Sequence, residues 1–159
     1  MLHIQKAVIE DAELLLSYIH KKAEFDGNMH GEPATVSTTL EKIKHTLFSD
    51  TPFATVLFAR NDADETLGFA LYHTRYSSFT GQPSIWMDDL FVNADFRSQG
   101  VGNELLKALK HIASNIDASH LSWHANVKNS RGQDFYNRFG AEVECAEGPV
   151  LVYRYQMQE

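Results

Sequence analysis

The sequence contains one cysteine, Cys145, among 159 residues. A single cysteine excludes an internal disulfide and a metal site built from several thiolates, and it fits a reducing compartment. The eight histidines show no H-x-x-H or H-E-x-x-H spacing, so we expect no metal site. No apolar run approaches the ~18 residues of a membrane-spanning helix, and the first residues, MLHIQKAVIEDAE, lack a signal-peptide pattern. We therefore expect a cytoplasmic protein that does not contact a membrane.

Basic residues are in the minority and form no block. The chain has 14 Lys and Arg against 21 Asp and Glu, a net charge of −7. Nucleic-acid binders need a basic patch, so this charge argues against a general nucleic-acid partner and suits a cationic small substrate. Hydrophobic content of 43% and charged content of 22% are ordinary for a globular protein. The length predicts a single domain over residues 1–159.

Hydrophobic periodicity and turn residues predict an α/β fold, with a mixed twisted sheet of about seven strands and four helices. The expected strands are 2–9, 52–60, 65–76, 84–92, 120–126, 141–147 and 150–156. The expected helices are 10–25, 37–48, 100–115 and 130–139, and 27–33 is expected to be a loop. Asp11 is the expected N-cap of the first helix, and the spacing of Ser130 and Gln133 matches a capping box.

The segment FRSQGVGNELLKALKHIA runs from two closely spaced glycines into an amphipathic helix. Glycines ahead of a helix let backbone N–H groups approach a phosphate closely. No Lys-Ser/Thr pair follows Gly102, which excludes a P-loop. Leu105 stands where a dinucleotide fingerprint has its third glycine, which disfavours a dinucleotide. Spacing alone leaves a structural turn and another phosphate-bearing ligand open.

Two segments carry a family resemblance. Arg97-x-x-Gly100-x-Gly102, preceded by DDLFVNADF, and the later NSRGQDFYNRFGA resemble the GNAT acetyltransferase superfamily, and GFALY with MDDLFV resembles its diamine (spermidine/spermine and thialysine) branch. The resemblance implies a single-domain GNAT-like fold whose sheet splays between the fourth and fifth strands. It implies an N-acetyltransferase that moves an acetyl group from acetyl-CoA directly to a primary amine of a small di- or polyamine. A homodimer formed through C-terminal strands such as VLVYRYQ is also implied.

The same resemblance assigns catalytic residues. Asp88 would accept the proton of the amine, directly or through water, and Tyr136 would protonate the leaving thiolate. Because neighbouring side chains on a strand point to opposite faces, only one of Asp88 and Asp89 can face the substrate. Without the resemblance, Asp88 is equally an acid with a structural hydrogen bond. Tyr136, beside a core stripe of Phe135 and Phe139, is equally a core member.

The resemblance also implies binding residues. The backbone N–H near Leu90 would face the thioester carbonyl and Phe91 and Val92 would pair with pantetheine, while the Leu90 and Val92 side chains are expected in the core. The other implied cofactor-binding residues are Arg97, Ser98, Gln99, Gly100, Val101, Gly102, Asn103, Asn129, Ser130, Arg131 and Gly132. The implied substrate-binding residues are Glu24, Phe25 and Asp26 after the first helix, then Asp88, Ser122, Trp123, His124 and Glu147. Asn129 is equally an N-cap, and exposed acids are often only solvated.

At two positions the sequence differs from the pattern of the diamine branch, so the identity of the acceptor amine is left open. Ser77 stands where the branch often carries an acid, and Pro149 stands where a tryptophan is expected. Both weaken the case for long polyamines, so a lysine-like amino acid, a peptide N-terminus or another amine remain alternatives. A non-catalytic CoA-binding sensor is an alternative from another class. It would not need Asp88 or Tyr136, so their presence counts against it.

Overall fold

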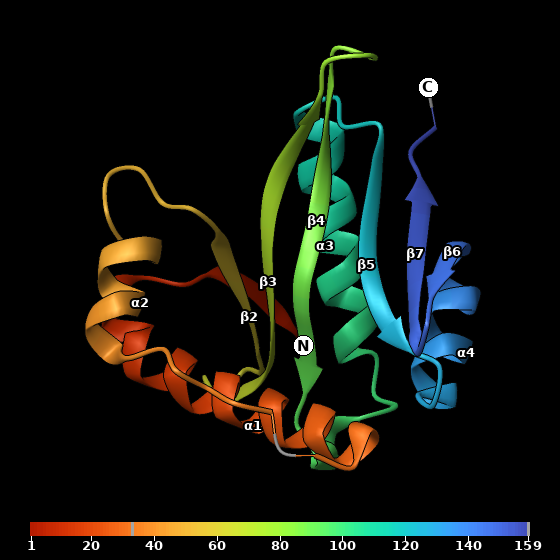
Figure 1. Ribbon diagram of the computed structural model, residues 1–159. Coiled ribbons are helices and arrows are strands. Elements are labelled where there is room, and N and C mark those ends of the chain that lie inside the picture. The colour runs from red at the N-terminus through yellow and green to blue at the C-terminus, as the bar shows by residue number, and fades with distance from the viewer. Residues whose placement is uncertain (33, 159) are drawn as a thin grey trace. The chain divides into compact units, whose positions relative to one another are not determined.

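The computed structural model describes residues 1–32 and 34–158, which contain seven strands and four α-helices (Figure 1). The strands are β1 (His3–Lys6), β2 (Thr55–Arg60), β3 (Thr66–Ser77), β4 (Gln82–Val92), β5 (His120–Asn126), β6 (Glu142–Glu147) and β7 (Val150–Gln156). The α-helices are α1 (Ala12–His30), α2 (Leu40–Leu47), α3 (Val101–Asn115) and α4 (Ser130–Phe139). Two short 3-10 helices, η1 (Ile9–Asp11) and η2 (Ala94–Phe96), complete the set. The predicted fold class is confirmed.

The strands form one mixed sheet in the order β1-β2-β3-β4-β5-β7-β6. β4 runs parallel to β5, whereas β1–β2, β5–β7 and β6–β7 are antiparallel pairs. β7 is hydrogen-bonded on both sides, by β5 and by β6, so β6 is the terminal strand of the order. The apolar strand VLVYRYQ therefore has no open edge for a partner, because its own hairpin covers that edge.

The chain divides into two compact units. The first, here called the N-terminal unit, comprises Met1–Leu71 and Asp89–Leu105, and the second, the C-terminal unit, comprises Tyr72–Asp88 and Leu106–Glu159. In the N-terminal unit, α1 packs against strands through Tyr18, whose ring meets Phe58, Phe69 and Phe91 at centroid distances of 5.9, 5.6 and 6.2 Å. Burial raises the pKa of Tyr18, and its hydroxyl donates to Thr66 O.

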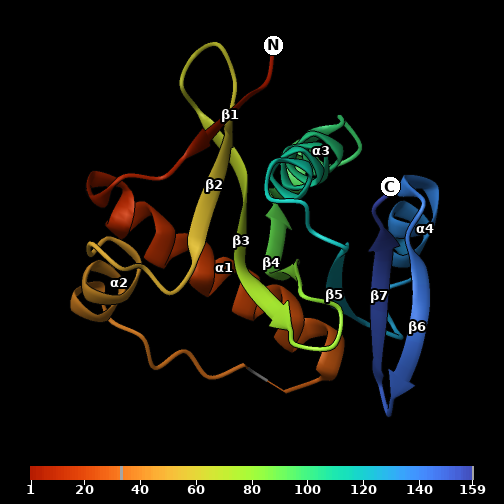
Figure 2. The same ribbon diagram turned by 90° about the horizontal axis from the view of Figure 1, so that it is seen from above.

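The core of the C-terminal unit is also aromatic. In both views β5, β7 and β6 lie side by side with α4 alongside them (Figures 1 and 2). Trp123 of β5 stacks on Tyr153 of β7 with a centroid distance of 6.2 Å and an interplanar angle of 7°. Phe139 of α4 meets Tyr155 of β7 at 5.1 Å. These ring contacts fix α4 on one face of β5 and β7.

The first helix is longer than the sequence pattern predicts. α1 continues through Gly27 to His30, and the expected loop 27–33 is wrong for its first four residues. The helix ends at Gly31, which adopts a left-handed φ of 78° and donates its N–H to the carbonyl of Gly27. Glycine takes this conformation without a Cβ penalty, so Gly31 is the stop signal, and buried Gly27 stays helical. Pro33 lies outside the described residues.

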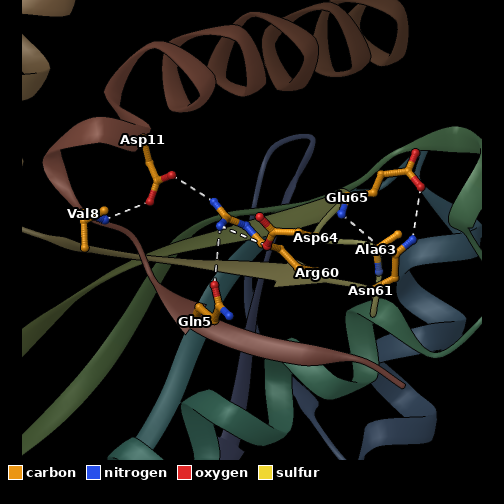
Figure 3. A network of polar contacts seen from close by, with 8 residues as sticks. All are labelled: Gln5, Val8, Asp11, Arg60, Asn61, Ala63, Asp64 and Glu65. Atoms are coloured by element: carbon orange, nitrogen blue, oxygen red, sulfur yellow. Dashed lines mark hydrogen bonds and ion pairs between the residues drawn. The ribbon is translucent and has the colours of Figure 1, made fainter.

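Asp11 stands at the N-cap position of α1 but does not cap it. Its carboxylate accepts the backbone N–H of Val8 at 2.9 Å and forms an ion pair with Arg60 at 2.9 Å (Figure 3). The Arg60 side chain also reaches Gln5 and Asp64, each at 3.5 Å. This network, defined by Asp11 and Arg60, ties η1 to the β2–β3 turn.

Replacing Arg60 with alanine should lower the free energy of unfolding by about 2 kcal/mol, because a half-buried Asp11 carboxylate would lose its charged partner. The Arg60 and Asp11 side chains are only 16% and 18% exposed. Urea unfolding followed by circular dichroism measures the effect. Asp64→Asn is the matched control, since Asp64 is 77% exposed and its loss should change stability by less than about 0.5 kcal/mol. Equal effects of the two substitutions would contradict the role of the Asp11–Arg60 pair.

Candidate functional site

The carboxyl end of β4 presents its residues alternately to two faces. Phe91 is buried and meets Tyr18 and Phe25 of α1, each at a centroid distance of 6.2 Å. Leu90 and Val92 are partly exposed, so the expectation that both are core residues is wrong. The physical reason is strand alternation: Phe91 takes the face covered by α1, and its two neighbours take the other.

The segment after β4 is held by Arg97. Its Nε donates to the carbonyl of Val92 at 3.0 Å, and its guanidinium lies 5.0 Å from the Phe25 ring centre and 5.6 Å from that of Phe91. The predicted arginine is therefore anchored to the strand that precedes the glycines. Gln99 is anchored as well, because its side-chain amide donates to the carbonyl of Asp95 at 3.0 Å.

Two left-handed residues shape the glycine segment. Ser98 has a φ of 62° and Gly100 a φ of 86°, and the space where a Cβ of Gly100 would stand is open. The first helical bond of α3 runs from the N–H of Glu104 to the carbonyl of Gly100 at 3.0 Å. The amides of Val101, Gly102 and Asn103 thus lie in the first turn, where a helix has no carbonyls of its own to receive them.

This arrangement fits a phosphate group. Backbone N–H groups at a helix N-terminus favour an anion without needing a lysine, and the open space at Gly100 admits a close approach. Val101 contributes only its amide, because its side chain is buried. The positive φ of Ser98 is a feature that sequence inspection missed, since serine gives no signal for a left-handed backbone.

In the C-terminal unit, the pairing of β4 with β5 ends beside two predicted catalytic residues. The register pairs Ile85, Trp86 and Met87 with Leu121, Ser122 and Trp123. Asp88 directly follows Met87 and is exposed. On the other strand, the Trp123 ring meets the Tyr136 ring at a centroid distance of 5.1 Å. Met87 and Trp123 form the last residue pair of the β4–β5 register. Asp88 follows Met87 in the chain, and the ring of Tyr136 packs on Trp123, so both predicted catalytic residues lie near the end of this pairing.

Tyr136 is the buried aromatic residue of α4. Only 8% of its surface is exposed, and its ring contacts Trp123, Phe135 and Tyr153 at 5.1, 5.3 and 5.2 Å. Phe135 and Phe139, expected as the core stripe, are instead partly exposed. The difference arises because β5 and β7 present a tryptophan and a tyrosine to α4, and the helix turns Tyr136 into that aromatic face.

The start of α4 is capped by Asn129. Its side-chain oxygen accepts the N–H of Gly132 at 2.9 Å, so the capping box expected from Ser130 and Gln133 is wrong. The Gln133 amide instead donates to the carbonyls of Asn126 and Val127. Ser130 and Arg131 are exposed at this helix start. α4 ends as predicted at Gly140, which has a φ of 100°.

The predicted substrate stretch on β5 divides between two faces. Trp123 is 1% exposed and packs against Tyr136 and Tyr153, whereas Ser122 and His124 lie on the opposite face by alternation. His124 is exposed and its ring meets the edge of Trp86 at 4.7 Å. Trp123 therefore supports Tyr136, while Ser122 and His124 belong to the face that carries Trp86.

The substrate-binding residues predicted to follow the first helix, Glu24, Phe25 and Asp26, lie within α1 instead, and each has different surroundings. Phe25 points to Phe91 and Arg97, and Asp26 pairs with Lys22 one turn earlier. Glu24 is exposed and lines an open cavity of about 560 Å³ on another face of the helix. In the C-terminal unit, Glu147 is exposed at the end of β6, opposite Val150.

Sequence inspection also missed a cation–aromatic pair in the C-terminal unit. The guanidinium of Arg75 lies 3.8 Å from the centre of the Trp86 ring. Arg75 is on β3 and Trp86 on β4, so no local sequence pattern indicates the contact. Within residues 1–32 and 34–158, no cluster of three or more His, Cys, Asp or Glu could hold a metal ion. In the same residues, no helix combines the length and apolar character needed to cross a membrane.

Comparison with known proteins assigns the family. The model of the Acetyltransferase (GNAT) family matches residues 20–141, so the chain belongs to the GNAT acetyltransferase family. This match spans the glycine segment, Asp88 and Tyr136, and it confirms the family resemblance of the sequence motifs.

Relatives and solved structures agree with this assignment. Thialysine N-epsilon-acetyltransferase of Bos taurus is 28% identical over 153 residues, covering 91% of this chain and 87% of that protein. Spermidine/spermine N(1)-acetyltransferase-like protein 1 of Homo sapiens is 28% identical over 118 residues, 70% of this chain and 17% of that protein. The fold matches that of PaiA N-acetyltransferase from Thermoplasma acidophilum, solved in complex with coenzyme A, with a TM-score of 0.74, 17% identity and 99% coverage of each chain.

Proposed function

We propose that this GNAT acetyltransferase moves an acetyl group from acetyl-CoA directly to a primary amine of a small di- or polyamine. The observation that carries the proposal is that Asp88 and Tyr136 both lie at the end of the β4–β5 pairing, Asp88 directly after Met87 on the face of Trp86 and Tyr136 against Trp123 on the other face. A carboxylate and a phenol are the two proton carriers that amine acylation by a thioester needs. The Bos taurus relative supports the branch through its name.

Acetyl-CoA would supply the acetyl thioester, and the residues of this chain would bind and position it. The amides of Val101, Gly102 and Asn103, with Arg97, would hold the pyrophosphate, supported by the open backbone at Gly100. The backbone of Leu90–Val92 would align the thioester arm. Asn129–Gly132, at the start of α4, would provide further contacts, although the Asn129 side chain also caps the helix.

At the acceptor, Asp88 would take the proton of the attacking amine. A lysine-like amine with a pKa of ~10.4 is neutral only about one part in 10³ near pH 7, so a proton acceptor is needed. Tyr136 would give its proton to the departing sulfur. The other proposed acceptor-binding residues are Glu24, Phe25 and Asp26 in the N-terminal unit and Ser122, His124 and Glu147 in the C-terminal unit. Trp123 is buried, so its proposed part is to support Tyr136. A homodimer also remains part of the proposal, with β6 as the strand whose edge is open.

A second acceptor class is an amino acid with a side-chain amine. Two observations favour it: Ser77 at the end of β3 replaces the acid expected for polyamines, and the Bos taurus relative is named for thialysine. Both candidates use the same catalytic pair. They differ in whether the far end of the acceptor is cationic or also carries a carboxylate.

An amine panel tests the proposal. The protein with acetyl-CoA is incubated with 1,4-diaminobutane, spermidine, L-lysine and a peptide with a free N-terminus, and released CoA is measured with a thiol reagent. We expect the small diamine or the diamino acid to give at least about tenfold higher kcat/KM than the peptide. Equal rates for all amines would reject selectivity for small acceptors. Acetyl-CoA binding without CoA release on any amine would instead favour a non-catalytic CoA-binding sensor.

A further inference from the structure

On one face of the C-terminal unit, a guanidinium and an imidazole ring contact Trp86. The Arg75 guanidinium lies over the Trp86 ring at 3.8 Å, and the His124 ring meets the same tryptophan edge-on at 4.7 Å. Trp86 is only 7% exposed. The face also carries Arg154, which pairs with Ser122 in the β5–β7 register. This patch, here called the Arg75–Trp86–His124 face, therefore carries two arginines in a chain whose net charge is −7.

The charges of this face are not all available to a ligand. Arg154 forms an ion pair with Glu144 at 3.1 Å and also donates to the side chain of Gln156. Burial lowers the pKa of His120, and the guanidinium of Arg154 and then that of Arg75 lower it further, against a rise from Glu144. The surroundings of His120 therefore disfavour its charged form. Arg75 has no hydrogen bond or ion pair with any other described residue.

The geometry of Arg75 suits a carboxylate. The Arg75 guanidinium lies over the indole ring at 3.8 Å, and its N–H donors, which all lie in the guanidinium plane, form a fork that a carboxylate can accept with both oxygens. Stacking on the ring also reduces the freedom that Arg75 would lose on binding. A second ammonium group of a polyamine would find no acid here, because the nearby Glu144 is already paired with Arg154.

The distance to Asp88 sets the size of the acceptor. Asp88 follows Trp86 by two residues on β4, so strand alternation places both on the same face, about 7 Å apart along the strand. About five or six single bonds cover that span. An acceptor could therefore place its carboxylate at Arg75 and its amine at Asp88.

We propose that the Arg75–Trp86–His124 face is a carboxylate subsite, and that the acceptor is a small zwitterionic diamino acid whose terminal amine reaches Asp88. Arg75 would bind the carboxylate, and Trp86, contacted by the guanidinium at 3.8 Å and by the His124 ring at 4.7 Å, would support Arg75 from below. This inference rests on the proposed acetyl transfer and selects between its two acceptor classes.

Matched acceptors test the subsite. L-Lysine carries the carboxylate, L-lysinamide neutralises it, and 1,5-diaminopentane lacks it, while all three offer a terminal amine. In the wild-type protein we expect kcat/KM for L-lysine to exceed that for L-lysinamide and for 1,5-diaminopentane by about tenfold or more. Arg75→Gln should reduce both ratios to near one and change the rates with the two acceptors that lack a carboxylate by less than about threefold.

Two further variants sharpen the result. Arg75→Lys keeps the charge but loses the planar fork, so it should recover only part of the preference for L-lysine. Lys128→Gln removes one positive charge from an exposed position of the same unit and should leave both ratios unchanged. Equal wild-type rates with L-lysine and L-lysinamide would overturn the subsite, as would a preference that survives in Arg75→Gln.

A binding measurement separates failure of the subsite from failure of the proposed function. The chain has two tryptophans, so a ¹H–¹⁵N spectrum shows two indole signals, and Trp86→Phe assigns them. If no amine leads to CoA release, acetyl transfer to amines is rejected, but titration with L-lysine still tests the subsite.

Carboxylate binding is supported if L-lysine shifts the Trp86 signal of the wild-type protein, while L-lysinamide does not shift it and L-lysine does not shift it in Arg75→Gln. No shift in wild type overturns it. An unchanged Trp123 signal confirms that the variant is folded.

Discussion

Tyr136→Phe is expected to lower kcat for CoA release by about 10²-fold while leaving the affinity for acetyl-CoA nearly unchanged. The substitution keeps the ring that packs against Trp123 and Tyr153 at 5.1 and 5.2 Å, so the fold of the C-terminal unit should be retained. It removes only the phenolic O–H. A proton donor to the leaving sulfur acts during the reaction and not during binding, so the loss should fall on turnover.

Rates of CoA release at saturating acetyl-CoA and amine, together with calorimetric titration of acetyl-CoA, measure the two quantities. Tyr153→Phe is the matched control. Tyr153 belongs to the same aromatic cluster, is 1% exposed, and has its pKa raised by burial. Its loss of a hydroxyl should change kcat by less than about threefold if the effect is specific to Tyr136. A Tyr136→Phe protein with the wild-type rate would remove Tyr136 from the chemistry, and a matching loss of acetyl-CoA affinity would make it a binding residue.

Asp88→Asn is expected to lower kcat/KM by about 10²-fold at pH 7, and the deficit should shrink as the pH rises. In the proposed reaction the Asp88 carboxylate takes a proton from an amine whose pKa is ~10.4, so at neutral pH the variant would have to rely on the small neutral fraction of the amine. Each unit by which the pH rises towards that pKa increases the neutral fraction of the amine about tenfold, so the variant should gain more from high pH than the wild type. Asp88 is exposed, so we expect the Asp88→Asn protein to fold as the wild type does.

Profiles of kcat/KM between about pH 6.5 and 9.5 test this expectation. Asp89→Asn makes the same chemical change one residue further along β4, on the opposite face of the strand. Asp89→Asn should not steepen the pH profile, whatever its effect on stability. Parallel profiles for wild type and Asp88→Asn would contradict proton acceptance by Asp88, and steepening in Asp89→Asn would transfer that role to Asp89.

Local patterns determined much of the fold. Thr39 caps α2 by accepting the N–H of Lys42, Gly140 ends α4, and short apolar runs bounded by turn residues mark strands such as β2, β3 and β4. The motifs around Gly100 and Tyr136 identified the family before the structure was considered, and the match over residues 20–141 confirms it. These features depend on neighbours within a few residues, which is why they can be predicted from sequence alone.

Tertiary contacts decided the rest. Tyr136 became the buried residue of α4 because Trp123 and Tyr153, from two other strands, surround its ring. The Asp11 side chain does not cap α1, because its carboxylate accepts a hydrogen bond from Arg60, 49 positions away in the chain.

The Arg75–Trp86 contact joins two strands, so periodicity along either one cannot reveal it. The sequence by itself determined the family, and acetyl-CoA is the donor that this family implies. The tertiary structure determined which side chains share a face of the sheet, because neighbours on a sheet face come from strands far apart in the chain. The proposed carboxylate-binding site for the acceptor rests on those neighbours.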